Sequence, residues 1–208
     1  MDTTEGLRTC NYAARRSATL CLGFALAALT WSTPLPAADE PLILDDRASD
    51  TLCTSSGACW RLITDQVMGG VSDGDLEPTT VEGRPCLRLT GDVSLLNNGG
   101  FVQASLDLDQ AGPLDARAYA GIEADVYGNG QGYNLHLRTA DTRIVWQSYR
   151  ASFQATPSWH TLRLPFRQFE PYRIDRPLDL ARLKRLGLVA IGREMQADLC
   201  IARLALYP

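Results

Sequence analysis

Strict alternation of apolar and polar residues is the feature that most constrains how this chain can fold. In segment 102–109, for example, Val, Ala, Leu and Leu alternate with Gln, Ser, Asp and Asp. A period of two places one set of side chains on each face of a β-strand. The pattern returns in segments 87–90, 122–127, 133–138, 143–152, 159–164, 186–191 and 199–206. Several short strands of this kind predict an all-β chain folded as an antiparallel β-sandwich or jelly roll.

Turn signals separate these segments. The glycine-rich loop 128–132, reading GNGQG, lies between two alternating segments and predicts a β-hairpin. One short helix is expected at 178–183, after Pro177 and with Asp179 in its first turn. No repeat or second domain boundary interrupts the pattern, so residues 60–208 are predicted to form a single β-sandwich domain.

The first 38 residues have the features of an export signal. Arg15 and Arg16 precede an apolar run at 18–29, and small residues follow up to Ala38. The run is short for a membrane span, so we expect cleavage and no stable span afterwards, with an uncleaved anchor as the alternative. Residues 39–59 form a lead-in that contains a cysteine loop. The protein is therefore expected to be exported, either periplasmic or secreted.

The charge balance argues against two classes of partner. The formal net charge is −4, and the leader contributes +1 (three Arg against Asp2 and Glu5), so the remainder carries −5. Nucleic-acid-binding proteins usually present a basic surface, and anionic membranes attract basic segments. Neither partner is expected here.

Four cysteines follow the leader: Cys53, Cys59, Cys86 and Cys200. An even number in an exported chain predicts disulfides, and we favour Cys53–Cys59 with Cys86–Cys200 among the three pairings. The second bridge conflicts with strand parity. Cys200 is expected on the same face of the last strand as its apolar residues. Cys86 is expected on the face of its own strand that carries polar residues. If both strands are regular, that bridge is strained or absent.

Two Gly-Gly pairs with polar neighbours stand out from the strand pattern. They occur in segment 60–72, reading WRLITDQVMGGVS, and in segment 97–101, reading NNGGF. Glycine pairs mark structural corners, or places where the main chain is open to a ligand. Under the second interpretation, one recognition rim would combine Asp65, Met68, Gly69, Gly70, Asn97, Asn98, Gly99 and Gly100.

A second polar group lies on one face of segment 133–138 and consists of Asn134, His136 and Arg138. A hairpin at 128–132 would add Glu123 and Asp125 to that face. The group is then either a solvated face with ordinary ion pairs or a binding surface for sugar or peptide. General acid–base catalysis by His136 and a carboxylate is a third interpretation.

The tryptophans and the second histidine are the remaining residues that bear on binding. Exposed aromatic rings can stack on sugars, which makes Trp146 and Trp159 the candidates for a platform. His160 shares parity with apolar residues and is expected to be a core or edge histidine.

Catalytic and cofactor motifs are missing. The chain has no GxSxG, HExxH or P-loop motif, and its cysteine spacing does not fit zinc. Asp107 and Asp109 could hold calcium together with Asp65 or Asp73, but the ligand set is not specified. We therefore predict no cofactor and no enzymatic activity.

Taken in order, these motifs resemble the complex I intermediate-associated protein 30 family. The resemblance covers 60–206 and is carried by DQVMGGVS (65–72), NNGGF (97–101), GNG (128–130), YNLHLR (133–138), YRASF (149–153), WHTLRLPF (159–166) and FEP (169–171). It implies a galactose-binding-domain-like sandwich and a non-catalytic helper that binds proteins during assembly of NADH:ubiquinone oxidoreductase.

Two main hypotheses follow. In the first, an exported, non-catalytic module binds a protein partner through the glycine rim, as an assembly helper. In the second, a carbohydrate-binding module of the cell envelope uses Trp146 or Trp159 with polar contacts from Asn134, His136 and Arg138.

Overall fold

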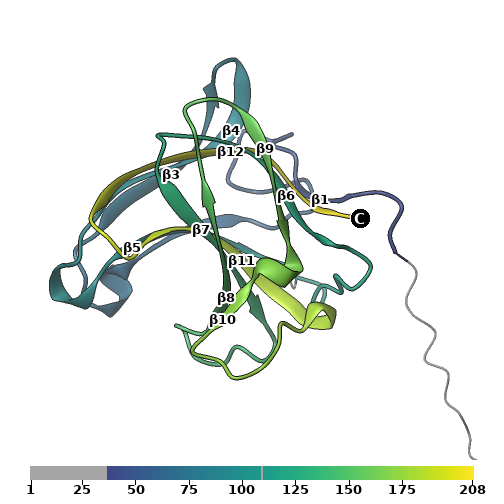
Figure 1. Cartoon of the computed structure of the whole chain (residues 1–208). Helices are drawn as coiled ribbons and strands as arrows, with labels where there is room; N and C mark the ends of the chain where they lie inside the picture. Colours follow the sequence, from purple (N-terminus) through teal and green to yellow (C-terminus); the bar gives the residue numbers. More distant parts are fainter. Residues whose placement is uncertain (1–36, 109) are drawn as a thin grey trace, which may run out of the picture. The chain divides into compact units, whose positions relative to one another are not determined.

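A computed structural model describes residues 37–108 and 110–208 of this chain. Within them it contains twelve strands and four short 3-10 helices (Figure 1). The strands form two six-stranded sheets in which neighbouring strands pair antiparallel. The prediction of an all-β antiparallel sandwich is confirmed.

The first sheet has the strand order β3-β4-β12-β6-β9, and β1 also pairs with β12. The long last strand, β12, runs through the middle of this sheet. Its first part pairs with β4, its last part with β1, and its other edge with β6. The bounds are β1 Leu42–Asp45, β3 Asp73–Val81, β4 Arg84–Val93, β6 Gly121–Gly128, β9 His160–Pro165 and β12 Met195–Tyr207.

The second sheet has the order β10-β8-β7-β11-β5-β2. Its bounds are β2 Trp60–Thr64, β5 Phe101–Asp107, β7 Gly132–Thr139, β8 Ser148–Gln154, β10 Glu170–Tyr172 and β11 Leu183–Ile191. The 3-10 helices are η1 Asp65–Met68, η2 Leu96–Asn98, η3 Phe166–Gln168 and η4 Leu180–Arg182. The helix η4 lies inside the segment 178–183 where a short helix was expected.

The hydrophobic core consists of the alternate residues that each sheet turns toward the other. Leu87, Leu89 and Ile122 of the first sheet are fully buried, as are Leu135 and Leu188 of the second. Because alternate positions fill the core, the residues between them form the two outer faces of the sandwich. One of these outer faces carries the candidate site.

The predicted hairpin at 128–132 is wrong. Strand β6 belongs to the first sheet and β7 to the second, so this loop crosses between the layers. Its amides bond to a third segment, since Gly128 N–H donates to Thr156 O (2.9 Å) and Gly130 N–H donates to Ala155 O (2.7 Å). The polar faces of β6 and β7 therefore lie on opposite outer surfaces.

The lead-in is part of the first sheet. Strand β1 pairs with β12, and the buried Asp45 at its end accepts hydrogen bonds from Trp60 Nε1 (2.7 Å) and Arg47 Nη1 (3.0 Å). The hydrogen bond from Trp60 to Asp45 joins the lead-in to β2 of the second sheet.

Both predicted disulfides, Cys53–Cys59 and Cys86–Cys200, are present. The parity objection to the second bridge is wrong because β12 is irregular, with a register shift between Ile201 and Arg203. One extra residue in a strand reverses which face the later side chains occupy. Cys200 therefore lies with Cys86 outside the main core, although Leu204 points into it.

Two disulfides in one domain are typical of proteins outside the reducing cytosol, which suggests an exported protein. The predicted export signal falls almost entirely on residues 1–36, outside the described residues. Among the described residues, no helix has the length and apolar character needed to cross a membrane.

Candidate functional site

A cleft of about 640 Å³ opens on the outer face of the second sheet. Strands β5, β11, β7 and β8 form its floor. The segment between β7 and β8, together with residues after β10, forms one side, and the glycine-rich segments form the other. Clefts of a few hundred cubic ångströms suit small ligands or short polymer segments.

The floor is built around Gly187 of β11. The register of the sheet places Ser105, Gly187, His136 and Arg150 in one row across four strands. A Cβ added at Gly187 would lie 2.5 Å from Nε2 of Gln103, so the glycine makes room for that side chain over the sheet. Gln103 thereby presents an amide to the cleft.

His136 lies on this floor as a neutral residue. Its side chain is buried, and burial lowers its pKa to about 3, with a further contribution from the positive charge of Arg150. Its Nε2 atom is buried and has no hydrogen-bond partner among the described residues. A buried polar atom of this kind is unfavourable unless a water or ligand satisfies it.

Aromatic rings border the cleft. Trp146 is 50% exposed and Tyr172 is 38% exposed, and both line the cleft. The Arg150 guanidinium lies over the Tyr172 ring, 3.4 Å from its centroid, in a cation–π contact. Arg138 supports the segment that carries Trp146, because its guanidinium donates to Ile144 O (3.0 Å).

The glycine-rich segments meet at Asp65. This buried carboxylate accepts hydrogen bonds from Ser72 N–H (2.9 Å) and the Ser72 hydroxyl, and from the amides of Gly100 and Phe101. Burial raises its pKa, but these hydrogen bonds outweigh burial, so the net pKa is lowered. Asp65 therefore ties two segments together that are about thirty residues apart in the chain.

Both glycine doublets pack against this carboxylate. A Cβ at Gly70 or at Gly99 would collide with the Asp65 side chain, so neither position can take a larger residue without rearrangement. The structure thus brings the doublets together, but the amide of Gly100 already donates its hydrogen bond to Asp65. The N–H of Gly100 is therefore not available to a ligand.

The other members of the predicted rim are divided. Met68, Asn98, Gly99 and Gly100 line the cleft, whereas Gly69 and Asn97 are exposed and lie outside its lining. Asp65 and Gly70 are buried beneath it. What was predicted as a separate rim is one wall of the same cleft that contains His136 and Arg138.

The second polar group is also divided. His136 and Arg138 line the cleft, while Asn134 is outside the lining and accepts a hydrogen bond from Ser152 Oγ (2.9 Å). Glu123, which was expected beside His136, lies on the opposite outer surface and binds Arg163 and Arg203. Acid–base catalysis by His136 and that carboxylate is excluded by their separation.

Of the two tryptophans considered as platforms, only Trp146 lines the cleft. Trp159 packs near the Cys86–Cys200 bridge on the first sheet, and its Nε1 donates to Val81 O (3.0 Å). His160 is half-buried at the start of β9, where its ring contacts Thr156 and the carbonyl of Gln154. It belongs to the edge of the sandwich, as expected.

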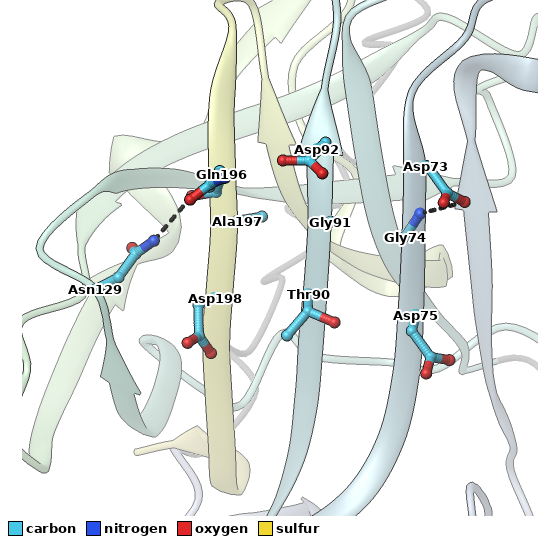
Figure 2. Close-up of a pocket in the computed structure, with 10 residues that line it drawn as sticks. All are labelled: Asp73, Gly74, Asp75, Thr90, Gly91, Asp92, Asn129, Gln196, Ala197 and Asp198. Atoms are coloured by element: carbon cyan, nitrogen blue, oxygen red, sulfur yellow. Dashed lines mark hydrogen bonds between the residues drawn. The ribbon is translucent and has the colours of Figure 1, made fainter.

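A second, shallower hollow of about 530 Å³ lies on the outer face of the first sheet. Figure 2 shows the carboxylates of Asp73, Asp75, Asp92 and Asp198 on strands β3, β4 and β12, beside the contact between Asn129 and Gln196 O (2.8 Å). Within residues 37–108 and 110–208, no group of His, Cys, Asp or Glu side chains is arranged to hold a metal ion.

The calcium alternative has no support in the placement of its ligands. Asp107 is paired with Arg61 and with Arg185, and Asp65 is enclosed by its own hydrogen-bond donors. Asp109 lies outside the described residues.

Sequence reasoning did not single out Gln103, Arg150, Tyr172 or Arg185 as site residues. They come from four different strands, and the residue pattern of each strand is that of an ordinary solvent-exposed face. One signal was available, because Arg138 and Arg150 occupy outward positions in strands with few carboxylates.

The two-layer antiparallel sandwich, with a cleft on the outer face of one sheet, is a fold consistent with galactose-binding-like domains. The chain belongs to the family described as complex I intermediate-associated protein 30 (CIA30), which it matches over residues 50–201. This membership confirms the resemblance and agrees with the prediction of a non-catalytic binding domain.

Solved structures with the same fold include carbohydrate-binding modules of Clostridium thermocellum. The family 11 module of the cellulosomal cellulase Lic26A-Cel5E is similar with a TM-score of 0.61 and 13% identity, covering 82% of this chain and 96% of that one. The family 11 module in complex with a beta-1,3-1,4-mixed-linked tetrasaccharide gives 0.62 and 14%, covering 82% and 97%. The family 30 module of Cel9D-Cel44B gives 0.53 and 14%, covering 83% and 94%. A comparison with curated protein sequences found no match.

Proposed function

We propose that this protein is an exported, non-catalytic module that binds carbohydrate in the cleft of the second sheet. The observation that carries the proposal is the pairing of exposed aromatic rings, Trp146 and Tyr172, with hydrogen-bonding side chains on a concave sheet face. A sugar ring presents an apolar face that packs on an aromatic ring and hydroxyl groups that bond to polar side chains.

The cleft supplies both kinds of contact at once. Gln103 offers an amide that can donate and accept, and Arg138 and Arg150 offer donors only. The structural similarity to a family 11 module that was solved with a mixed-linked tetrasaccharide supports the same class of ligand here.

Substituting Trp146→Ala tests the proposal by isothermal titration calorimetry or affinity electrophoresis against a panel of soluble oligosaccharides. Loss of one stacking ring should weaken binding roughly tenfold or more. Leu96→Ala is the matched control, because Leu96 is exposed, apolar and outside the cleft lining. No binding by the unmodified protein, or equal binding by both variants, would contradict the proposal.

A protein partner is the second candidate, and one observation favours it. Apolar side chains stand exposed on the glycine-rich segments beside the cleft, with Val67 at 73% and Leu96 at 65%, together with Met68, Val71 and Leu95. Exposed apolar groups at one place mark protein-binding surfaces. Such a partner would fit the helper role that the family description implies for assembly of complex I.

The two candidates are separable with single variants. Val71→Asp and Leu96→Asp should abolish capture of a defined partner from an envelope extract while leaving the oligosaccharide titration unchanged, because neither residue lines the cleft. Trp146→Ala should do the reverse. Capture that survives both charged substitutions would eliminate the rim as a protein-binding surface.

A further inference from the structure

The cleft is positively charged although the chain as a whole is negative. Four arginines line it, Arg138, Arg150, Arg173 and Arg185, and no Asp or Glu does. The whole chain carries a formal net charge of −4. A concentration of one sign in a cleft raises the local concentration of ligands with the opposite charge.

Most of this positive charge has no neutralising partner. Only Arg185 is paired, with Asp107. Arg138 donates to the carbonyl of Ile144, Arg150 donates to Ser148 Oγ (3.0 Å), and Arg173 donates to the Tyr172 hydroxyl (3.3 Å). Among the described residues none of these three forms an ion pair.

The outer face of the first sheet provides the contrast. There Arg84, Arg88, Arg163 and Arg203 each form an ion pair with a carboxylate on another strand of the same sheet. These four arginines of the first sheet are therefore neutralised, whereas Arg138, Arg150 and Arg173 in the cleft are not.

The unpaired charges also crowd one another within a partly buried site. Burial lowers the pKa of Arg138, and the charge of Arg185 lowers it further. Burial lowers the pKa of Arg150 as well, and Arg173 adds to this effect against an opposing contribution from Tyr172. A bound anion would relieve both the desolvation and the repulsion.

A second observation on the floor also points to a ligand. His136 is only 8% exposed, lines the cleft and has an unpartnered Nε2 atom. Its low pKa leaves that ring neutral, so it adds a hydrogen-bonding group without more charge.

We propose that the cleft selects a glycan whose sugar residues carry anionic groups, with the anion held by Arg150 and Arg138 beside Trp146 and Tyr172. A planar guanidinium can bind a carboxylate through two parallel hydrogen bonds, and it also suits sulfate. This inference rests on the proposed carbohydrate-binding function and names the class of carbohydrate.

The test is a calorimetric titration of the full protein with four oligosaccharides of equal length. They are an oligogalacturonate, its methyl ester, a sulfated galactan and a cello-oligosaccharide. The methyl ester keeps the sugar chain and removes the charge. We expect the oligogalacturonate or the sulfated chain to bind at least about tenfold more tightly than both neutral chains, and the tighter of the two identifies the anion.

Arg150→Gln is expected to reduce binding of the anionic chain by roughly tenfold and to leave neutral chains unaffected. Arg173→Gln is the second variant, because that exposed side chain can be changed without loss of packing. Arg163→Gln, on the opposite face, is the control with an equal change in net charge. Binding of the anionic chain should also weaken as salt rises.

The outcomes separate the inference from the function on which it rests. If neutral chains bind as tightly as anionic ones in a Trp146-dependent manner, the carbohydrate function stands and the anionic preference is wrong. If no oligosaccharide binds, both are wrong. Anionic binding that Arg150→Gln and Arg173→Gln leave unchanged would likewise overturn the inference.

Discussion

Replacing Asp65 by Asn should destabilise the domain far more than its single-atom change suggests. The carboxylate accepts two hydrogen bonds from Ser72, through its amide and its hydroxyl, and others from the amides of Gly100 and Phe101. An asparagine has only one acceptor oxygen, so its NH₂ group must face at least one of these donors. The substitution therefore converts an attractive contact into a repulsive one in a site without solvent.

The magnitude follows from the hydrogen bonds. In the better of the two orientations of the asparagine amide, its NH₂ group faces only the Ser72 N–H. That hydrogen bond, which is charge-assisted in the unmodified protein, is then lost at a cost of about 1.5–3 kcal/mol. The remaining bonds lose the assistance of the negative charge, which roughly halves their strength. Together these effects predict a loss of about 3–5 kcal/mol, or about 10 °C in Tm for a domain of this size.

Urea denaturation at pH 7 measures the loss, and Asp92→Asn is the matched control because Asp92 is an exposed carboxylate on the first sheet. The pH dependence gives a second readout. The pKa of Asp65 is lowered on folding, so its contribution is complete above the unfolded value of 3.8 and is lost as pH falls through the lowered folded pKa. Asp65→Asn should lack that part of the acid transition. A loss below about 1 kcal/mol relative to the control would refute the assigned role.

Three further outcomes are expected. Removing the Cys86–Cys200 bridge, which joins residues 114 apart, should cost about 4–5 kcal/mol on the chain-entropy model, whereas removing Cys53–Cys59, with a separation of 6, should cost about 2 kcal/mol. Non-reducing urea denaturation of the double serine variants checks this, and equal losses would contradict it. The pKa of His136 is lowered to about 3, below its unfolded value, so its contribution to stability is present above pH 6.5 and falls as pH decreases. Between pH 6.5 and 5, His136 should lower the free energy of unfolding by at most about 2 kcal/mol, and His136→Gln should remove this pH dependence. An unchanged pH dependence would show that His136 is not its source. In an NMR titration, the His136 ring should not protonate between pH 7 and 5.

Features that depend on local periodicity or motif order were predictable from the sequence. Alternation reports directly which side chains share a face of a strand, and this was enough for an all-β sandwich. The glycine-rich motifs in their order identified the family, and an even number of cysteines after an expected export signal predicted disulfides. All of these signals are contained in short segments or in their order along the chain.

Features that depend on which strands become neighbours were not predictable. The loop 128–132 resembled a hairpin, because alternation says nothing about whether the next strand stays in the same sheet. The parity of Cys200 was misassigned because β12 was treated as regular, although its core residues step from Ile201 to Leu204 and so break the period of two. The glycine doublets were recognised as a pair, but the carboxylate between them was assigned to binding rather than to structure.

The sequence by itself determined the class of fold, the family and the types of residue available for binding, because these follow from local pattern and composition. Only the tertiary structure decided that half of the predicted rim lines one cleft with His136, Trp146 and four arginines. Those residues come from strands β7, β8 and β11, from the segment between β7 and β8, and from segments after β2, before β5 and after β10. Their meeting depends on long-range strand order. Strand order is set by the packing of two whole sheets against each other, which no short segment records.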